Sequence, residues 1–363
     1  MFLLRSVKKA DAADIFELSQ LSNFINLPPH LETINDMIVV SERSFLRPSK
    51  VFSENIYMFA LEDKKTGKVV AVSLIHAQHG TEAEPHFFLK VGHESKFSET
   101  LNTGFVHGTL QFGMDTNGPT EIGALILHPN YRGHKEKLGK QISFVRFLFM
   151  SLFPERFQEI VHAELMPPFD TDGNSPLWEA LGRKFLNMGY LEADVLSRKS
   201  KEFILSLFPS ENIYQSLLPA QARWAIGQVG EETKPVKKML ESVGFRYTQE
   251  VDPFDGGPHY RCPLKEIFQI KNAFRGKVRL TNPGTGKKNK MFKQGLIAFD
   301  RAGNLVPGQA SSAQLENFSS LKLFYFYDAT KKEVQLDPEE LENFLDVFQG
   351  LANDQKEVFG VPF

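Results

Sequence analysis

The chain has 363 residues, a formal net charge of −2, and a composition of 42% hydrophobic and 24% charged residues. That length predicts two or three packed units rather than one, and the composition is typical of a soluble globular protein. The near-neutral charge gives no electrostatic reason to expect nucleic acid or an anionic membrane as a partner.

The cysteine content and the start of the chain bear on where the protein works. Cys262 is the one cysteine, so an internal disulfide and a cysteine-based metal cage are both excluded. The apolar run at Met1–Leu4 is too short for a signal peptide. No stretch approaches the roughly 18 consecutive apolar residues of a membrane span. We therefore expect a cytoplasmic protein.

The first predicted elements are a strand at 2–7 and two helices. Apolar residues recur at helical spacing from residue 11 onward and again over 34–45. A hairpin follows, with strands at 56–62 and 68–75 joined by a polar turn that ends in a glycine. The segment 79–119 has weak periodicity, and we expect short strands and loops that cover a site.

The middle of the chain has the clearest pattern. The near-continuous apolar run at 122–127 predicts a strand buried on both faces, and an amphipathic helix follows from about 135 to 150. Another strand is expected at 160–165. Ser175 can cap a helix that begins with Pro176 and runs to about Asn187. This order of strand, loop, helix and strand indicates an α/β architecture.

The second half repeats similar elements. Strands are expected at 203–208, 225–229 and 245–247, and a helix at 234–243 that ends at Gly244. From about 270 glycine and lysine increase, and short strands (295–300, 321–327) and a helix (338–351) are expected. These last elements predict a small β-rich appendage.

The segment 121–141 predicts an anion site. A buried strand runs into a glycine-containing loop and then a helix, whose first amides are unpaired and whose dipole favours negative charge. Arg132 adds a cation suited to phosphate. Coenzyme A would fit, because its pyrophosphate can lie at the helix and its amide-bearing pantetheine arm along the strand. An ordinary strand–turn–helix is the alternative.

A resemblance to known enzymes extends this hypothesis. The sequence at 125–133, Leu-Ile-Leu-His-Pro-Asn-Tyr-Arg-Gly, resembles the acyl-CoA strand and loop of the GNAT superfamily. Further segments resemble the arginine N-succinyltransferases, in the order of that family and over roughly residues 1–265: Val145–Met150, Ala163–Leu165, Ser175–Gly182, Ile226–Val229, Val243–Tyr247 and Asp255–Pro258.

The resemblance implies a fold, a domain division and an activity. The expected fold is α/β (α+β), with two GNAT-like halves containing mixed sheets, at 1–195 and 196–268, and a small β-rich region at 269–363. The implied activity is transfer of a succinyl group from succinyl-CoA to the α-amine of arginine or a similar cationic amino acid, in arginine catabolism.

The implied cofactor-binding residues lie on the strand and loop already described. They are Leu125, Ile126, Leu127, Arg132, Gly133 and Gly139. The loop departs from the family pattern, because it is about two residues longer and Lys137 aligns with its first glycine. The positive charge of Lys137 suits phosphate, but the close backbone approach that glycine permits would be lost.

A second departure concerns the proton donor. After Ile226–Val229 the family has a histidine described as the donor, and this chain has Gly230. General acid help is worth about 10²–10⁴-fold, whereas oxyanion stabilisation is usually the larger contribution. Three hypotheses remain: activity through a substitute donor, activity on another amine, or an impaired CoA-binding subunit that pairs with an active relative.

Candidates for the missing roles follow from neighbouring motifs. His259 is the first substitute donor to test, and an exposed loop histidine is the alternative. Glu164, Asp252 and Asp255 are candidates to bind a guanidinium group as a carboxylate fork, with Glu164 first. A structural ion pair of Glu164 with Arg146 or Arg183 is the rival. No metal site is expected. A homodimer, or a heteromer with a related chain, is expected because exposed sheet edges are commonly paired.

Overall fold

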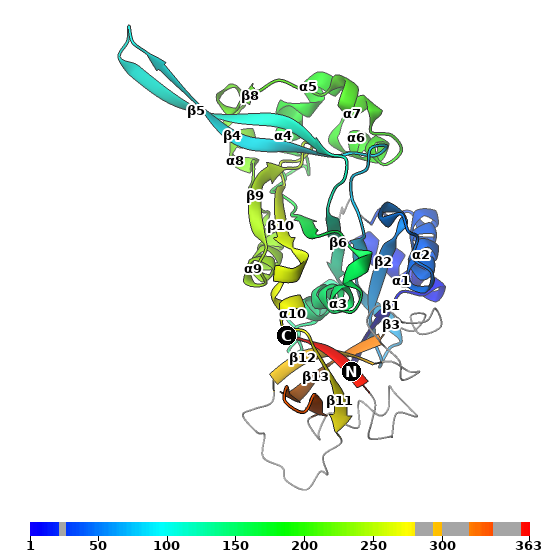
Figure 1. Cartoon of the computed structure of the whole chain (residues 1–363). Coiled ribbons are helices and arrows are strands. Elements are labelled where there is room, and N and C mark those ends of the chain that lie inside the picture. Colours follow the sequence, from blue (N-terminus) through cyan, green and yellow to red (C-terminus); the bar gives the residue numbers. More distant parts are fainter. Residues whose placement is uncertain (22–26, 280–292, 300–318, 337–356) are drawn as a thin grey trace. The chain divides into compact units, whose positions relative to one another are not determined.

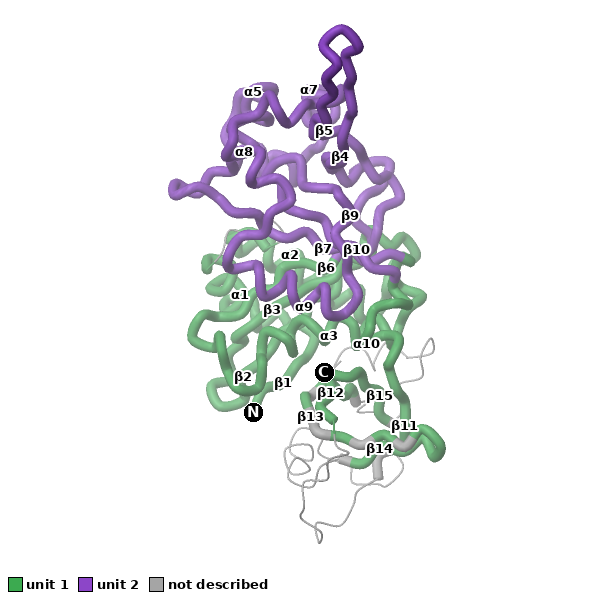
Figure 2. Tube along the Cα trace, turned by 90° about the vertical axis from the view of Figure 1, so that its left-hand side faces the viewer, with its two compact units in different colours: residues 1–77, 122–159, 264–363 green, residues 78–121, 160–263 purple. Residues whose placement is uncertain are grey.

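A computed structural model of the chain describes residues 1–21, 27–279, 293–299, 319–336 and 357–363. The chain forms two compact units (Figure 2). Unit 1 comprises Met1–Ala77, Ile122–Glu159 and Leu264–Phe363, and unit 2 comprises Gln78–Glu121 and Ile160–Pro263. The units interleave along the sequence, so their boundaries differ from the expected ranges 1–195, 196–268 and 269–363.

Unit 1 is built on a mixed sheet. Its described strands, in spatial order, are β12 (Lys293–Phe299), β15 (Glu357–Pro362), β11 (Phe274–Arg279), β14 (Glu333–Leu336), β13 (Ser319–Asp328), β1 (Phe2–Ser6), β2 (Ile56–Asp63), β3 (Lys68–His76) and β6 (Thr120–Leu127). β2 and β3 form the expected hairpin, with Ile56 opposite His76 and Asp63 opposite Lys68. The expected helix at 338–351 lies outside the described residues.

Helices cover both faces of the sheet in unit 1. Helices α1 (Ala12–Ser19) and α2 (Leu31–Leu46) share a buried cluster with β2, β3 and β6, which includes Ile15, Ile38 and Ile126. Helix α3 (Leu138–Leu152) packs on the other face, where the hydroxyl of Ser73 donates to the carbonyl of Ile142 at 2.7 Å. Most of α3 is buried, and its apolar side chains all round the axis explain why. A short helix, α10 (Phe268–Lys271), precedes β11.

Unit 2 has a second run of strands, in the order β7 (Ile160–Glu164), β10 (Pro258–Pro263), β9 (Arg246–Val251), β4 (His86–Ser98), β5 (Thr103–Asp115) and β8 (Ile213–Tyr214). β4 and β5 form one long hairpin, visible in cyan in Figure 1. The expectation of short strands over 79–119 is therefore wrong. The weak periodicity of segment 79–119 has a physical cause. The distal half of the hairpin is exposed, so no buried face requires apolar and polar residues to alternate there.

The helices of unit 2 are short. They are α4 (Pro176–Ala180), α5 (Gly182–Leu186), α6 (Tyr190–Ser197), α7 (Glu202–Leu207), α8 (Ala220–Ala225) and α9 (Lys234–Ser242). Ser175 caps α4 as expected, since its hydroxyl accepts from the amide of Trp178 at 3.1 Å. The single helix expected to Asn187 is interrupted at Leu181. There a side chain on Gly182 would collide with the ring of Trp178, which approaches the backbone closely.

Two strands expected in unit 2 are wrong. Residues 203–207 belong to α7, where Ile204 is buried against the core of the unit. Ala225 ends α8 and residues 226–229 follow as a loop, because Gly227 has a φ of +69° that ends regular structure there. Among the described residues, no helix is both long and apolar enough to cross a membrane.

Candidate functional site

Strand β6 is irregular at its centre. Ala124 has a φ of +45°, a left-handed conformation that residues with a Cβ rarely adopt. Such a residue within a strand is typical of a bulge, which breaks the regular ladder. Beyond it Ile126 is buried, whereas Leu125 and Leu127 are half-buried. Leu125 and Leu127 are thus partly exposed just before the loop.

The loop after β6 keeps a glycine-like conformation at the position that aligns with a glycine. Lys137 has φ +56° and ψ +53°, and α3 begins directly after it, at Leu138 rather than at about 135. Gly133 also has a positive φ of +73°, and both it and Arg132 are exposed. Gly139 lies in the first turn of α3, half-buried near Leu127. Lys137 thus adopts a left-handed conformation that favours glycine, despite its side chain.

Three lysines gather at the N-terminus of α3. The ammonium groups of Lys140 and Lys322 lie 4.7 and 5.0 Å from the ring centre of Phe363. Burial lowers the pKa of Lys140, and the charges of Lys137 and Lys322 lower it further. The amino group of Lys322 also donates to the carbonyl of Glu136 at 3.3 Å. Mutually repelling cations at a helix N-terminus make a favourable place for an anion.

Arg146 is a buried cation, for which the sequence predicts only a possible ion pair with Glu164. It lies within α3 and is 2% exposed, and its guanidinium donates to the carbonyl and hydroxyl of Ser143 and, at 3.5 Å, to the carbonyl of Gly123 in β6. Burial lowers its pKa to about 9. The sequence does contain a sign of this burial, because Arg146 stands within the apolar run that forms α3.

In unit 2, four of the segments that carry the family resemblance come into contact. The hydroxyl of Ser175 donates to the carbonyl of Phe254 at 3.1 Å, just before Asp255–Pro258. The amide of Gly227 donates to the carbonyl of Gly256 at 2.9 Å, and that of Leu165 to the carbonyl of Pro258 at 3.2 Å. These segments, far apart in the sequence, therefore form one structural region.

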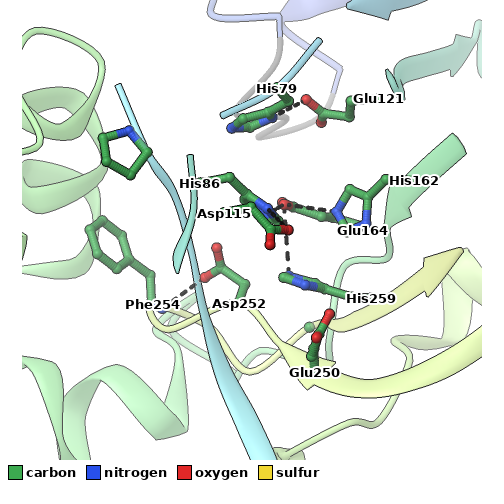
Figure 3. A network of polar contacts seen from close by, with 12 residues as sticks. His79, His86, Asp115, Glu121, His162, Glu164, Glu250, Asp252, Phe254 and His259 are labelled. Carbon is green, nitrogen blue, oxygen red and sulfur yellow. Dashed lines mark hydrogen bonds and ion pairs between the residues drawn. The ribbon is translucent and has the colours of Figure 1, made fainter. Parts of the chain in front are cut away.

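A cluster of three histidines and one glutamate lies beside this region (Figure 3). Glu164 stands opposite His259 in the pairing of β7 with β10. One carboxylate oxygen, Oε1 of Glu164, lies 2.9 Å from Nε2 of His86, 3.3 Å from Nε2 of His162 and 3.7 Å from Nε2 of His259. The Glu164 side chain is 24% exposed, whereas those of His162 and His259 are 0% exposed.

A second layer of polar groups surrounds the cluster. Oδ2 of Asp115 lies 3.7 Å from Nδ1 of His86 and accepts from Arg261 at 2.7 Å. Arg261 also donates to Nδ1 of His162 at 3.3 Å. His79 contacts Glu121, and its ring centre is 4.7 Å from that of His86. The cluster therefore lies among several carboxylates and one nearby guanidinium.

Burial and neighbouring charges shift the pKa values of the cluster in opposite directions. Burial alone lowers the pKa of His86, but Asp115 and Glu164 outweigh it and raise that pKa to about 9. Burial lowers the pKa of His162 to about 4 and holds that of His259 well below its usual value. Burial opposes ionisation of Glu164, yet the histidines keep its pKa low. His259 is thus neutral near pH 7.

The structure corrects two alternatives. His259 is not an exposed loop residue, because it is fully buried in β10. Glu164 pairs with neither rival arginine, since its carboxylate faces histidines while Arg183 pairs with Glu179. His86 and His162 were missed, although the His-x-Glu spacing in β7 places His162 and Glu164 on one face of a strand.

Asp255, also a candidate for the acceptor site, is buried and does not belong to the histidine cluster. It accepts from the amide of Gly257 at 2.7 Å, and the hydroxyl of Tyr190 lies 3.5 Å away. Burial raises its pKa well above the usual value, and the charge of nearby Asp252 adds to this. Burial and the charge of Glu164 similarly raise the pKa of Asp252 to about 7.

Gly230 occupies a tight position. Its amide donates to the carbonyl of Met166 at 2.9 Å. A Cβ added to Gly230 would lie 2.9 Å from the carbonyl oxygen of Pro167, too close without a shift of that backbone. A histidine therefore does not fit at this position in the present conformation.

The fold resembles that of one solved succinyltransferase subunit. A solved structure of arginine/ornithine succinyltransferase subunit AI from Pseudomonas aeruginosa is similar over 100% of this chain and 98% of its own, with a TM-score of 0.79 and 26% identity. The shared architecture is a mixed α/β fold with large mixed sheets. It is the fold of a succinyltransferase subunit.

The sequence comparisons define the family. The family model described as "Arginine N-succinyltransferase beta subunit" matches residues 2–269. A protein named arginine N-succinyltransferase from Enterobacter sp. (strain 638) is 34% identical over 79% of this chain and 83% of its own length. One of the same name from Escherichia coli (strain K12 / DH10B) is 32% identical over the same shares. The chain belongs to the arginine N-succinyltransferase family.

Proposed function

We propose that this chain is an N-acyltransferase that moves the succinyl group of succinyl-CoA to the α-amine of arginine or a similar cationic amino acid, in cytoplasmic arginine catabolism. The observation that carries the proposal is the family match over 2–269, together with the anion-favouring junction of β6 and α3. In this reaction the neutral amine attacks the thioester carbonyl, the C–N bond forms and the C–S bond breaks. The amine loses a proton and the departing thiolate gains one.

The β6–α3 junction supports a place for the coenzyme. We assign the pantetheine arm to the main chain of Leu125, Ile126 and Leu127, and the thioester oxygen to amides beside the bulge at Ala124. The pyrophosphate would lie at the start of α3, near Gly133 and Gly139, with Arg132 at the exposed rim. Lys137, Lys140 and Lys322 supply the positive charge there.

The acceptor side of the proposed reaction lies with carboxylates and a histidine of unit 2. Glu164 and Asp255 stay predicted contacts of the guanidinium group, and His259 stays a predicted proton donor. Because burial keeps His259 neutral, it would have to receive a proton before passing one to the thiolate. Arg146 is a further candidate, because a buried cation that contacts β6 is suited to the carboxylate of the succinyl group.

The test is to incubate the purified chain with succinyl-CoA and measure CoA thiol release with arginine, ornithine, lysine and Nα-acetylarginine. We expect release with arginine or ornithine, none with the blocked amine, and N-succinyl product by mass spectrometry. Lys140→Met should raise the KM for succinyl-CoA about 10- to 150-fold, because a charged hydrogen bond contributes roughly 1.5–3 kcal/mol. Lys65→Met, in the exposed turn after β2, is the matched control and should leave the KM for succinyl-CoA unchanged.

Two outcomes would count against the proposal. The absence of CoA release with any amine would favour the impaired-subunit hypothesis. That hypothesis gains support if activity returns on adding a related chain. Release with an unrelated amine and not with arginine would instead favour a changed acceptor.

Sedimentation of the purified chain would show whether it forms the expected homodimer.

A further inference from the structure

We propose that unit 2 holds a divalent transition-metal ion, most suitably zinc, bound by His86, His162, Glu164 and His259. These residues come from three strands, β4, β7 and β10. Each offers one ligand atom, and these four atoms lie within 4.8 Å of one another. The site shares Glu164 and His259 with the acceptor side of the proposed acyl transfer, and it includes no residue of the β6–α3 junction.

The spacing of the ligand atoms matches a tetrahedral zinc site. Zinc binds imidazole nitrogen and carboxylate oxygen at about 2.0–2.2 Å, which places neighbouring ligand atoms of a tetrahedron about 3.3–3.6 Å apart. The three distances from Oε1 of Glu164 to the Nε2 atoms are 2.9, 3.3 and 3.7 Å. These three distances bracket the expected separation, and all four ligand atoms lie within 4.8 Å of one another. The histidine rings would have to move inward wherever two nitrogens lie farther apart than the edge of the tetrahedron.

His259 gives an independent sign that a partner is missing. Its side chain is fully buried, and neither ring nitrogen has a hydrogen-bond partner within the described part of the chain. A buried polar group without a partner is rare and costs about 1–3 kcal/mol. Its Nε2 is aimed at Glu164 but remains 3.7 Å away, too far for a hydrogen bond. A metal ion between them would give Nε2 a ligand bond.

The ligand chemistry favours zinc over magnesium or calcium. Three imidazoles and one carboxylate suit zinc, whereas the other two ions prefer all-oxygen surroundings. Four protein ligands close the tetrahedron, as in structural rather than catalytic zinc sites. The ion would join the start of β4 to β7 and β10, strands that β9 separates from β4 in the sheet. Its effect would therefore be to stabilise unit 2.

Surrounding groups both support and oppose binding. Asp115, 3.7 Å from Nδ1 of His86, is placed as the outer carboxylate that commonly orients a zinc-bound histidine. Arg261 opposes it, because a His162 bound through Nε2 carries its proton on Nδ1, which now accepts from Arg261. Metal binding thus requires Arg261 to turn away from His162. Its contacts with Asp115 and Glu250, at 2.7 and 3.3 Å, can remain.

The proposal also gives Glu164 and His259 a role different from the one predicted from the sequence. An ion at the cluster occupies Oε1 of Glu164 and Nε2 of His259. The metal-loaded form then has neither atom available for guanidinium binding or proton transfer. The two assignments are separable, because metal binding is measured without substrate.

The experiment uses the full chain without a polyhistidine tag. The metal content is measured by plasma mass spectrometry before and after dialysis against a chelator, and the stripped protein is titrated with Zn²⁺ and with Co²⁺. We expect one equivalent of tight binding, a rise in melting temperature, and the intense visible absorption of tetrahedral Co²⁺. Failure of the stripped wild-type chain to bind one equivalent, or a weak octahedral Co²⁺ spectrum, overturns the proposal.

Variants locate the site. His259→Gln and Glu164→Gln keep side-chain volume and should weaken Zn²⁺ binding at least 100-fold. His93→Ala, an exposed histidine on β4, is the matched control and should bind like the wild type. Far-ultraviolet circular dichroism shows whether each variant is folded. Equal Zn²⁺ affinity in folded His259→Gln and in wild type would place the ion elsewhere and refute the assignment.

Discussion

Restoring the family's histidine at position 230 should destabilise the chain rather than activate it. The amide of Gly230 is held by Met166, and an added Cβ meets the oxygen of Pro167 at 2.9 Å and its carbonyl carbon at 3.3 Å. Forcing a side chain into packed surroundings of this kind typically costs 1–3 kcal/mol. Gly230→His should therefore lower the free energy of unfolding by about that amount.

A nearly matched glycine provides the control. Gly189 and Gly230 both precede helical turns with similar backbone angles, φ −70° and ψ 156° against φ −59° and ψ 153°. An added Cβ at Gly189 meets nothing closer than Arg183 at 3.8 Å. Gly189→Ser should thus change the free energy of unfolding by less than about 0.5 kcal/mol. Gly230→Ser should lower it by most of the amount that Gly230→His does.

Urea denaturation followed by tryptophan fluorescence is a suitable assay. Both tryptophans, Trp178 and Trp224, lie in unit 2, so their signal reports the unit that contains the substitution. The steric reasoning is refuted if Gly230→His unfolds at the wild-type urea midpoint. A rate increase of more than about tenfold in an equally stable variant would show instead that the missing donor limits the enzyme.

Three further predictions follow from strain, charge and exposure. Lys137→Gly should raise the free energy of unfolding, measured in urea melts, by about 0.5–1 kcal/mol, because Lys137 has a φ of +56°. Lys137→Ala removes the charge but keeps the backbone strain, so it should not raise the free energy of unfolding. Asp252→Asn should stabilise the chain at pH 8 and not at pH 4. The folded pKa of about 7 lies above the usual 3.8, so stability present below about pH 4 is lost as pH rises toward 7. The gain, on the order of 1–4 kcal/mol, is read from urea melts at both pH values, and equal gains would contradict the buried-charge explanation. Phe97→Ser with Phe105→Ser should leave unfolding unchanged within about 0.5 kcal/mol, because these side chains are 67% and 62% exposed. Sedimentation velocity would then show weaker self-association if this hairpin is an interface.

The sequence predicted elements with strong local patterns. The β2–β3 hairpin, the buried strand β6 and helix α9 were found because apolar runs, a polar turn and Gly244 mark them locally. The sequence of segment 203–208 predicts a strand, which the structure does not show, because so short an apolar run does not distinguish the helical period from the strand period. Its helical form is set by packing of Ile204 in the core of unit 2. Such tertiary contacts are not visible in a short window.

The candidate site was predictable only in part. The β6–α3 junction lies in one continuous segment, so its residues could be named from a motif. The histidine cluster draws on β4, β7 and β10, whose pairing is long-range, and His86 has no local feature that sets it apart. Gly230 could be recognised as a departure from the family pattern. The reason that a histidine does not fit there lies in Pro167, 63 residues earlier in the chain.

Hydrogen–deuterium exchange with and without CoA tests most directly whether the β6–α3 junction holds the coenzyme. Slower exchange on adding CoA is predicted in peptides that cover 122–127 and 138–141, in wild type and in Lys65→Met alike. Unchanged exchange at these residues under saturating CoA, or protection confined to other parts of the chain, would contradict the assignment.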